Sequence, residues 1–298
     1  MQEKQKNPFV MGCMRINELT DQEVTEWVHH ALELGIHTFD HADIYAKGEC
    51  ETRFGEVLKN QPSLREDLVI QTKASIRSGY YDSSKEHLLT SVDESLARLQ
   101  TDYVDVFMLH RPDALMELDE IADTFDVLAG SGKVKTFGVS NFNRYQLEWL
   151  QAATHQPIQI NQLQFSPVHS SLLNTGIQAN TDFAGAIDRD GGVLTYCQQQ
   201  SITIQAWSPF QFGFFEGVYL DHPRFPELNT VLQGLADQYS VSKSAIVAAW
   251  ILRHPAGMQV VAGSTKISRI SEIAAASEIE LSRKEWYAIY QAAGNRLP

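Results

Sequence analysis

The sequence has few cysteines and no long apolar run, and these absences narrow the classes of protein that it can encode. Its three cysteines stand far apart, at positions 13, 50 and 197, without a CxxC pair, so neither disulfides nor a zinc cage is expected. The longest apolar run, Ser244–Leu252, falls well short of the roughly 18–20 residues of a membrane-spanning helix. The first six residues are polar with no apolar segment after them, so no secretory signal is expected. We therefore expect a cytoplasmic protein.

Basic residues are also scarce. The chain has 24 lysines and arginines against 37 aspartates and glutamates, a formal net charge of −13. Nucleic acids and anionic membranes both require a basic binding surface, so neither is an expected partner. The hydrophobic fraction of 43% is, in contrast, enough for a packed core. No linker-like segment divides the chain, and we expect a single domain over residues 1–298.

Short β-branched or apolar runs alternate with longer segments of helical spacing. The predicted strands are Phe9–Met14, His37–Ala42, Leu68–Ala74, Val104–His110, Thr136–Asn141, Gln159–Gln164, Thr203–Ser208 and Val260–Gly263. The first predicted helix begins at Thr20 or Asp21, and the others cover Thr52–Asn60, Lys85–Leu99, Leu115–Ala129, Arg144–Ala153, Gly192–Gln200, Ser242–Arg253 and Ile270–Ser277. This alternation predicts an α/β fold, a (β/α)8 TIM barrel. Pro226–Tyr239 and Arg283–Ala293 are predicted as two additional helices.

A doubly wound open sheet is the alternative to the barrel. Such sheets carry a GxGxxG turn between a strand and a helix, and no strand here is followed by one. The nearest glycine pair, Gly130 and Gly132, closes a predicted helix instead of opening one. These observations favour the barrel.

Charged and hydrogen-bonding residues stand at the ends of three successive predicted strands. Asp40, Lys73 and His110 each continue a row of alternate residues that faces the barrel interior, and Tyr45 lies just beyond the first row. The C-terminal strand ends form the active-site mouth of such barrels. An interior lysine is costly unless paired, and Asp40 offers the opposite charge. Each residue alone has a structural interpretation, but together they predict a catalytic site.

The segments around these residues resemble motifs of the aldo-keto reductases. TFDHADIY (residues 38–45) is similar to the family signature FDTAxxYG, and ETRFG (51–55) to the ExxLG that follows it. VIQTK (69–73) and DYVDVFMLH (102–110) resemble the family's lysine and histidine strands.

Further resemblances occur in the family's order along nearly the whole chain. GKVKTFGVSNF (132–142) is close to GKVRxxGVSNF, and NQ (161–162) and AWS (206–208) continue the series. HRPD (110–113) and SPVH (166–169) resemble a bacterial subgroup of the family.

The resemblance implies an oxidoreductase that transfers hydride reversibly between NAD(P)H and the carbonyl of a small aldehyde or ketone, without a metal. Tyr45 would be the general acid that protonates the carbonyl oxygen, and Lys73 would lower the pKa of that tyrosine. Asp40 would keep Lys73 charged and oriented. His110 would hydrogen-bond the substrate oxygen.

The resemblance also implies a site for the nicotinamide. Ser140, Asn141 and Gln162 correspond to residues that hold its carboxamide. Trp207 corresponds to the aromatic residue that stacks on its ring.

The rest of the cofactor would lie along the next two strands. Ser208 and Phe210 begin the loop expected over the pyrophosphate. Ser264, Lys266 and Arg269 match the residues that bind the adenosine 2′-phosphate, which favours NADPH over NADH.

Several residues near the mouth are candidates for the substrate pocket. They are Met14, Arg15 and Arg111, with the phenylalanines at 210, 212, 214 and 215. The phenylalanine cluster is either a small packed core of its own or a surface for an apolar carbonyl compound. His41 stands where a small residue is usual, and by its parity it faces away from the interior.

Two alternative functions use the same residues. A metal-dependent hydrolase on this barrel would take Asp40, His41, Asp43 and His110 as ligands. A non-catalytic regulatory subunit would keep the cofactor site without turnover. Four intact catalytic matches favour an enzyme, and the sequence does not indicate an oligomeric state.

Overall fold

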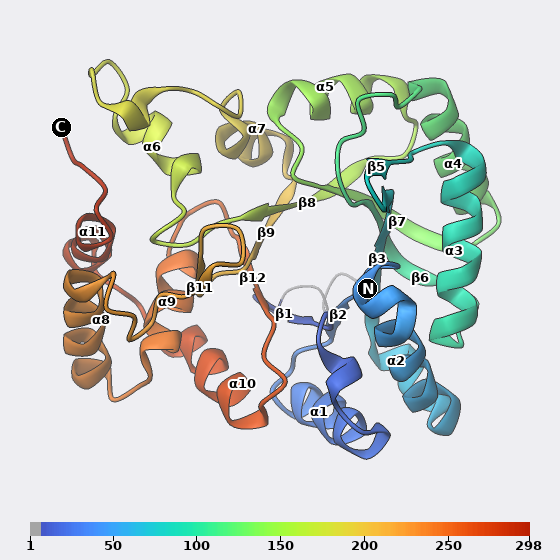
Figure 1. Cartoon of the computed structure of the whole chain (residues 1–298), viewed down its shortest axis with the longest axis horizontal. Coiled ribbons are helices and arrows are strands. Elements are labelled where there is room, and N and C mark those ends of the chain that lie inside the picture. The colour runs from blue at the N-terminus through green and yellow to red at the C-terminus, as the bar shows by residue number, and fades with distance from the viewer. Residues whose placement is uncertain (1–6) are drawn as a thin grey trace.

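The computed structural model describes residues 7–298, where eight parallel strands close into a barrel (Figure 1). The strands are β1 (Phe9–Gly12), β2 (Thr38–Asp40), β3 (Val69–Ala74), β6 (Val104–Leu109), β7 (Val134–Ser140), β8 (Ile158–Gln164), β9 (Thr203–Trp207) and β12 (Gln259–Ala262). They follow the order β1-β12-β9-β8-β7-β6-β3-β2, and β2 pairs with β1 to complete the ring. The predicted barrel is confirmed. Residues 1–6, part of the segment where a secretory signal would begin, lie outside the described residues.

Helices surround the barrel and connect successive strands (Figure 1). They are α1 (Asp21–Glu33), α2 (Glu49–Asn60), α3 (Lys85–Leu99), α4 (Leu118–Gly130), α5 (Arg144–Ala153), α6 (Ser171–Ile177), α7 (Val193–Gln200), α8 (Pro226–Tyr239), α9 (Lys243–Leu252), α10 (Ile267–Ala274) and α11 (Arg283–Ala292). The two additional helices predicted from the sequence are α8 and α11. Helix α6 was not predicted because its seven residues are too few for a clear helical period.

Side-chain caps fix where several helices begin. The Thr20 hydroxyl accepts a hydrogen bond from the Glu23 N–H, and the Glu23 carboxylate accepts one from the Thr20 N–H. Asn143 and Gln146 form the same reciprocal pair at the start of α5. Because four N–H groups at a helix start have no partner within the helix, each cap stabilises the fold by about 0.5–2 kcal/mol.

The apolar core fills the layer between the strands and the helices. Outward-facing Phe39 of β2 packs edge-on against Trp27 of α1, with ring centroids 5.7 Å apart. It also contacts Phe54 of α2 at 5.2 Å. Inside the barrel, Val106, Met108 and Ile160 form a separate small cluster. The interior also carries the polar side chains of Gln71, Lys73, Gln162 and Gln205, which form part of the site described below.

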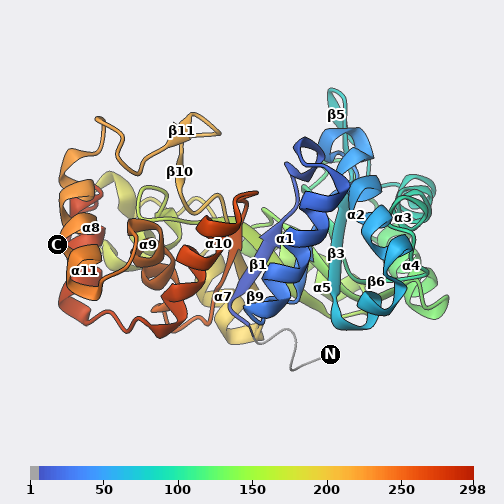
Figure 2. The same ribbon diagram turned by 90° about the horizontal axis from the view of Figure 1, so that it is seen from below.

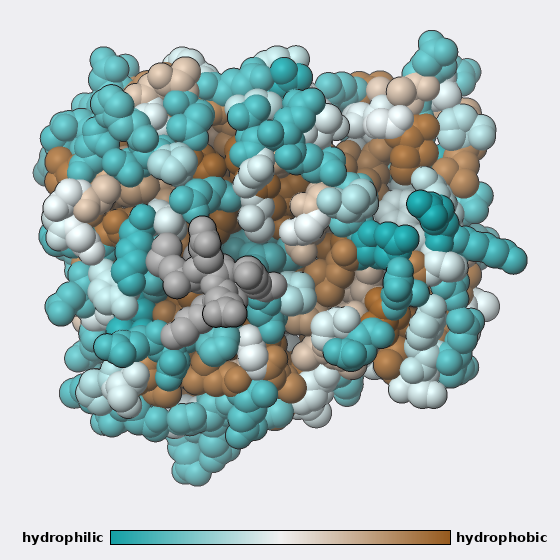
Figure 3. All heavy atoms as spheres, turned by 180° about the vertical axis from the view of Figure 1, so that it is seen from behind, coloured by the Kyte–Doolittle hydropathy of each residue, from teal (hydrophilic) through white to brown (hydrophobic). Residues whose placement is uncertain are grey.

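Two short hairpins rise from the end of the barrel that holds the C-termini of the strands (Figure 2). They are β4 (Ile76–Arg77) with β5 (Tyr80–Tyr81), and β10 (Gln211–Phe212) with β11 (Gly217–Val218). Figure 1 looks toward this end of the barrel. The opposite face has mostly hydrophilic side chains at its edge, with apolar patches between them (Figure 3). Within residues 7–298 no helix has both the length and the apolar character needed to cross a bilayer.

Candidate active site

A buried ion pair lies at the mouth of the barrel. Lys73 Nζ on β3 donates to Asp40 Oδ1 on β2 at 2.6 Å, and also to the His41 carbonyl at 2.7 Å. Only 1% of the Lys73 residue surface is exposed. Because an unpaired ammonium at such a site would be strongly destabilising, Asp40 is what allows Lys73 to be charged there. The pairing expected from the interior rows of the strands is present.

Glutamines inside the barrel hold the Asp40 carboxylate in place. Gln71 Nε2 and Gln162 Nε2 donate to Asp40 Oδ1 at 2.6 and 2.7 Å. Both nitrogens also donate to Gln205 Oε1 at 2.9 Å. With Lys73, three donors therefore converge on one carboxylate oxygen. Hydrogen bonds of this kind restrict the positions that the carboxylate can adopt.

Tyr45 and His110 lie beside the ion pair. Lys73 Nζ is 5.2 Å from the centroid of the Tyr45 ring. The rings of Tyr45 and His110 meet edge-on with centroids 6.1 Å apart. The structure thus brings the four predicted catalytic residues, Asp40, Tyr45, Lys73 and His110, to one place at the C-terminal ends of β2, β3 and β6.

The surroundings shift both titratable rings toward their neutral forms. Burial, followed by the negative charge of Asp40, raises the pKa of Tyr45 well above its ordinary value, whereas Arg111 acts in the opposite direction. The pKa of Tyr45 is therefore raised and not lowered as expected, because burial and the Asp40 charge outweigh the nearby positive charge of Arg111. Burial lowers the pKa of His110 well below 6.5, with the charges of Lys73 and Arg111 adding to the effect. Near pH 7 the site therefore holds a protonated phenol and a neutral imidazole.

His41 faces away from this mouth, as its parity predicts. Its ring packs edge-on against Phe54 of α2, with centroids 4.7 Å apart, and both ring nitrogens are buried without a hydrogen-bond partner. Burial, with a contribution from Lys73, lowers the pKa of His41 to about 3. The ring therefore does not point toward Asp40 and His110, the residues with which it would have to share a metal ion.

A second pair of acidic residues, Asp43 and Glu51, lies in the segment before Tyr45 and in α2. Glu51 of α2 is fully buried and accepts hydrogen bonds from Arg98 Nε at 2.8 Å and Thr72 Oγ1 at 2.5 Å. Asp43 lies nearby, and its Oδ1 is buried without a partner. Burial and then the Glu51 charge raise the pKa of Asp43 to about 7.

This shift predicts a pH dependence of stability. An ordinary aspartate has a pKa of 3.8, so between about pH 4 and 7 the unfolded chain ionises at Asp43 while the folded chain keeps its proton. The folded state then binds more protons, so the contribution of Asp43 to the free energy of unfolding is full below pH 4 and is lost as the pH rises through 7. We expect Asp43→Asn to flatten the profile of urea midpoints between pH 4 and 7. The exposed control Asp119→Asn should keep the wild-type profile; equal profiles for both variants would contradict the assignment.

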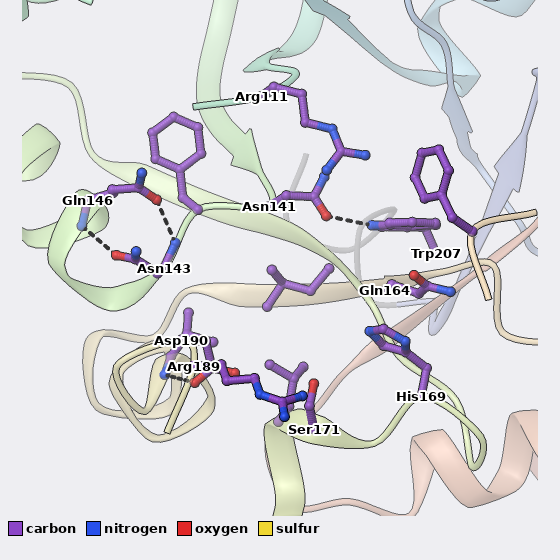
Figure 4. Close-up of a pocket in the computed structure, with 15 residues that line it drawn as sticks. Arg111, Asn141, Asn143, Gln146, Gln164, His169, Ser171, Arg189, Asp190 and Trp207 are labelled. Carbon is purple, nitrogen blue, oxygen red and sulfur yellow. Dashed lines mark hydrogen bonds between the residues drawn. The ribbon is translucent and has the colours of Figure 1, made fainter. Parts of the chain in front are cut away.

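Three of the residues predicted to bind the nicotinamide form a row joined by hydrogen bonds. The Ser140 hydroxyl donates to the Gln162 carbonyl at 3.2 Å, and Asn141 Nδ2 donates to the Ser140 hydroxyl at 2.8 Å. Trp207 Nε1 donates to Asn141 Oδ1 at 3.2 Å, and the two side chains point toward one another in Figure 4. The side-chain amide nitrogen of Gln162, predicted to hold the carboxamide, instead donates inside the barrel to Asp40 and Gln205.

The residues predicted for the rest of the cofactor lie after β9 and β12. Ser208 Oγ donates to Gln211 Oε1 at 2.9 Å, and Phe210 packs against the core. Ser264 Oγ accepts from the Lys266 N–H at 3.2 Å, immediately before α10. The Lys266 and Arg269 side chains are exposed, and neither forms an ion pair among residues 7–298. Two unpaired cations at a helix N-terminus can hold a phosphate.

A cavity of about 340 Å³ opens beside Trp207 and Asn141 (Figure 4). It is lined by Arg111, Asn141, Phe142, Asn143, Gln146, Leu163, Gln164, His169, Ser171, Leu172, Arg189, Asp190, Val193, Trp207 and Phe214. Of the predicted substrate-pocket residues, Arg111 and Phe214 line this cavity, whereas Met14 and Arg15 do not. The volume suits a small organic molecule.

The phenylalanine cluster divides into two parts. Phe212 is buried and contacts Phe225 with ring centroids 5.1 Å apart, as in a small packed core. Phe214 and Phe215 are exposed, and Phe215 stacks on the Trp207 ring at 6.0 Å. Of this cluster, only Phe214 and Phe215 therefore lie near the predicted site.

Sequence reasoning missed several residues of the site. Gln205 and Gln71 were not assigned a role, although Gln205 lies two positions before Trp207 and so on the same face of its strand. Arg189 was missed because it lies in a loop without a periodic pattern. The burial of Glu51 against Arg98 also gave no sequence signal beyond its place in the ETRFG segment.

Comparison with known proteins shows the family to which this chain is similar. The model described as "Aldo/keto reductase family" matches residues 8–293. Oxidoreductase YdhF of Escherichia coli is 35% identical over 297 residues, which cover 96% of this chain and 93% of that protein. A 6-dehydroglucose reductase of Novosphingobium aromaticivorans is 32% identical, covering 98% and 93% of the two chains. The resemblance to the family and its bacterial subgroup is confirmed.

Solved structures agree on the fold. The crystal structure of an aldo-keto reductase from Klebsiella pneumoniae in complex with NADPH superimposes with a TM-score of 0.77. The match covers 97% of this chain and 92% of that one at 23% sequence identity.

Proposed function

Because the chain belongs to the aldo/keto reductase family, we propose that its single barrel domain reduces the carbonyl group of a small aldehyde or ketone with NADPH. The observation that carries this proposal is the convergence of Tyr45 and His110 on the buried Lys73–Asp40 pair, next to the row of Ser140, Asn141 and Trp207 residues. NADPH would supply the hydride from its dihydropyridine ring.

Tyr45 is the group that we assign to proton transfer. Reduction of a carbonyl leaves negative charge on its oxygen, which must accept a proton as the hydride arrives. The raised pKa of Tyr45 keeps the phenol protonated at neutral pH. The Lys73 ammonium, 5.2 Å from the ring centroid, stabilises the phenolate that remains after the proton leaves.

His110 is assigned to the carbonyl oxygen. Its lowered pKa keeps the imidazole neutral near pH 7, so the ring has one N–H to donate without adding a full charge. A donor fixed beside the developing oxyanion stabilises the transition state more than the substrate. Asp40 and its glutamine donors act through Lys73 as positioning residues.

Three side chains at the mouth and two after β12 fit the cofactor. Asn141 Nδ2 and Ser140 Oγ are polar atoms beside the Trp207 indole, which suits a carboxamide on an aromatic ring. The unpaired Lys266 and Arg269 fit a 2′-phosphate and support NADPH over NADH. We place the activity in the cytoplasm, supported by three free, buried thiols.

The proposal is tested by turnover of 4-nitrobenzaldehyde with NADPH, followed by NADPH absorbance. We expect alcohol formation in step with cofactor oxidation, and the same rate after exhaustive treatment with a chelator. NADPH that binds without oxidation would favour a regulatory subunit. Activity that is lost with the chelator and restored by zinc would favour a metal enzyme.

Cofactor preference is a separate prediction. We expect NADPH to quench the tryptophan fluorescence with an affinity at least about tenfold higher than that of NADH, because a charge-assisted hydrogen bond contributes roughly 1.5–3 kcal/mol. Arg269→Gln should remove most of this difference by weakening NADPH binding alone. Arg283→Gln, an exposed arginine on α11, should change neither affinity. Equal binding of the two cofactors to the wild type would refute the phosphate site.

A further inference from the structure

We propose that the cavity beside the active site binds the carboxylate of an oxo-acid substrate, with Arg111 as its principal cation and Arg189 as a second cation across the cavity. This inference rests on the proposed carbonyl reduction and narrows its substrate class. In Figure 4 the two guanidinium groups stand on different sides of the cavity, with Asn141 and Trp207 near the first.

Arg111 joins the cavity to the reacting groups. It directly follows His110, and its backbone N–H donates to the Ser75 hydroxyl at 3.3 Å, which fixes the chain at this point. Its guanidinium lines the same cavity as Asn141 and Trp207, and its positive charge acts to lower the pKa of both Tyr45 and His110. A substrate with its carbonyl at Tyr45 can therefore place an attached anionic group against Arg111.

Neither arginine has an acidic partner in the structure of residues 7–298. Both carboxylates that flank Arg189 are occupied by backbone groups: Asp188 Oδ1 accepts from two N–H groups at 3.1 and 2.8 Å, and Asp190 Oδ1 accepts from Gly192 and Val193. The half-buried Arg111 guanidinium likewise forms no ion pair among these residues. Two arginines without an ion-pair partner among residues 7–298 therefore line one cavity of a chain whose formal net charge is −13.

Three amides of the cavity wall use one of their polar atoms in hydrogen bonds within the protein. Gln164 Nε2 donates to the Gly213 carbonyl at 3.1 Å. Asn143 Oδ1 and Gln146 Oε1 accept from each other's backbone N–H at 3.0 Å. The strongest donors left for a ligand are guanidinium groups. Because a guanidinium binds a carboxylate through two parallel charge-assisted hydrogen bonds, an anionic substrate fits this wall better than a neutral polyol.

The binding test uses two ligands of nearly the same shape that cannot be reduced: 4-carbamoylbenzoate and its methyl ester. Their affinities for the protein saturated with NADPH are measured by calorimetry at low salt. We expect the anion to bind at least about tenfold more tightly than the ester. Arg111→Gln should reduce this preference to about threefold or less, and Arg189→Gln should reduce it by a smaller factor. Arg283→Gln is the matched control and should keep the wild-type preference.

Two results would overturn the inference. One is equal affinity of the wild type for the anion and the ester, and the other is an undiminished preference in both cavity variants. Because Arg189 is exposed, Arg189→Gln should fold normally. It therefore tests the inference even if the Arg111→Gln variant does not fold. Added salt should lower the affinity for the anion and leave the affinity for the ester unchanged, because salt screens the charges of partly exposed arginines.

Turnover separates this inference from the proposed function. Reduction of 4-nitrobenzaldehyde without a preference for the bound anion would refute the substrate class alone. Arginine-dependent binding of the anion without reduction of 4-nitrobenzaldehyde or 4-carboxybenzaldehyde would support the anion site and refute the proposed reductase activity.

Discussion

Tyr45→Phe is expected to lower kcat for aldehyde reduction by about 10²- to 10⁴-fold, the usual contribution of a positioned general acid. The variant loses one hydroxyl at a half-buried position and keeps the ring that faces Lys73 and His110. NADPH affinity and the unfolding temperature should therefore stay close to those of the wild type. Steady-state kinetics with 4-nitrobenzaldehyde, together with a cofactor titration, measure the effect.

A tyrosine outside the site serves as the control. Tyr287 of α11 is partly exposed and its ring packs against Trp286, so Tyr287→Phe makes the same chemical change away from the barrel mouth. It should keep wild-type turnover. A Tyr45→Phe enzyme as active as this control would show that another group delivers the proton.

Lys73→Met is expected to reduce both stability and turnover. Removing the ammonium leaves the Asp40 carboxylate buried without its counter-ion, which costs about 3–5 kcal/mol in comparable pairs. At roughly 2–4 °C per kcal/mol for a chain of this size, the unfolding midpoint should fall by at least about 6 °C. Turnover should fall as well, because the phenolate of Tyr45 loses its nearby positive charge. Calorimetric melting and kinetics at a temperature below both midpoints measure the two effects.

The double variant Lys73→Met with Asp40→Asn separates these effects. The neutral amide removes the unpaired charge, so most of the lost thermal stability should return while turnover stays low. An unchanged midpoint in the single variant would mean that the ion pair is not required for folding. Recovery of turnover in the double variant would contradict the role of Lys73 beside Tyr45.

The sequence pattern predicts the barrel and the four central residues because both depend on local regularities. Period-two rows place Asp40 and Lys73 on interior faces, and parallel strands bring their C-terminal ends together. Capping residues such as Thr20 and Asn143 set helix starts within a few residues. The helix α6 and the two hairpins at the mouth lack such regularities, and they were not predicted.

The parts of the site that were not predicted depend on closure of the ring and on loop conformation. Gln205 on β9 meets Gln71 on β3 only because the barrel closes, and their sequence separation of 134 residues gives no hint of the contact. The parity of His41 predicts that it faces outward, but its burial depends on the Phe54 ring of a separate helix. Arg189 reaches the cavity through a loop that Asp188 and Asp190 hold by bonds to backbone N–H groups.

The origin of the hydrogen in the product alcohol tests the proposed hydride transfer most directly. Reduction of 4-nitrobenzaldehyde with NADPH carrying deuterium at C4, prepared separately with the label on each face of the ring, gives an alcohol whose mass reports the transfer. We expect one deuterium in the product from one labelled cofactor and none from the other, since in the proposed site Trp207 and Asn141 would present a single face of the nicotinamide ring to the substrate. Unlabelled alcohol from both cofactors would show that no hydride passes directly to the carbonyl, and would contradict the account.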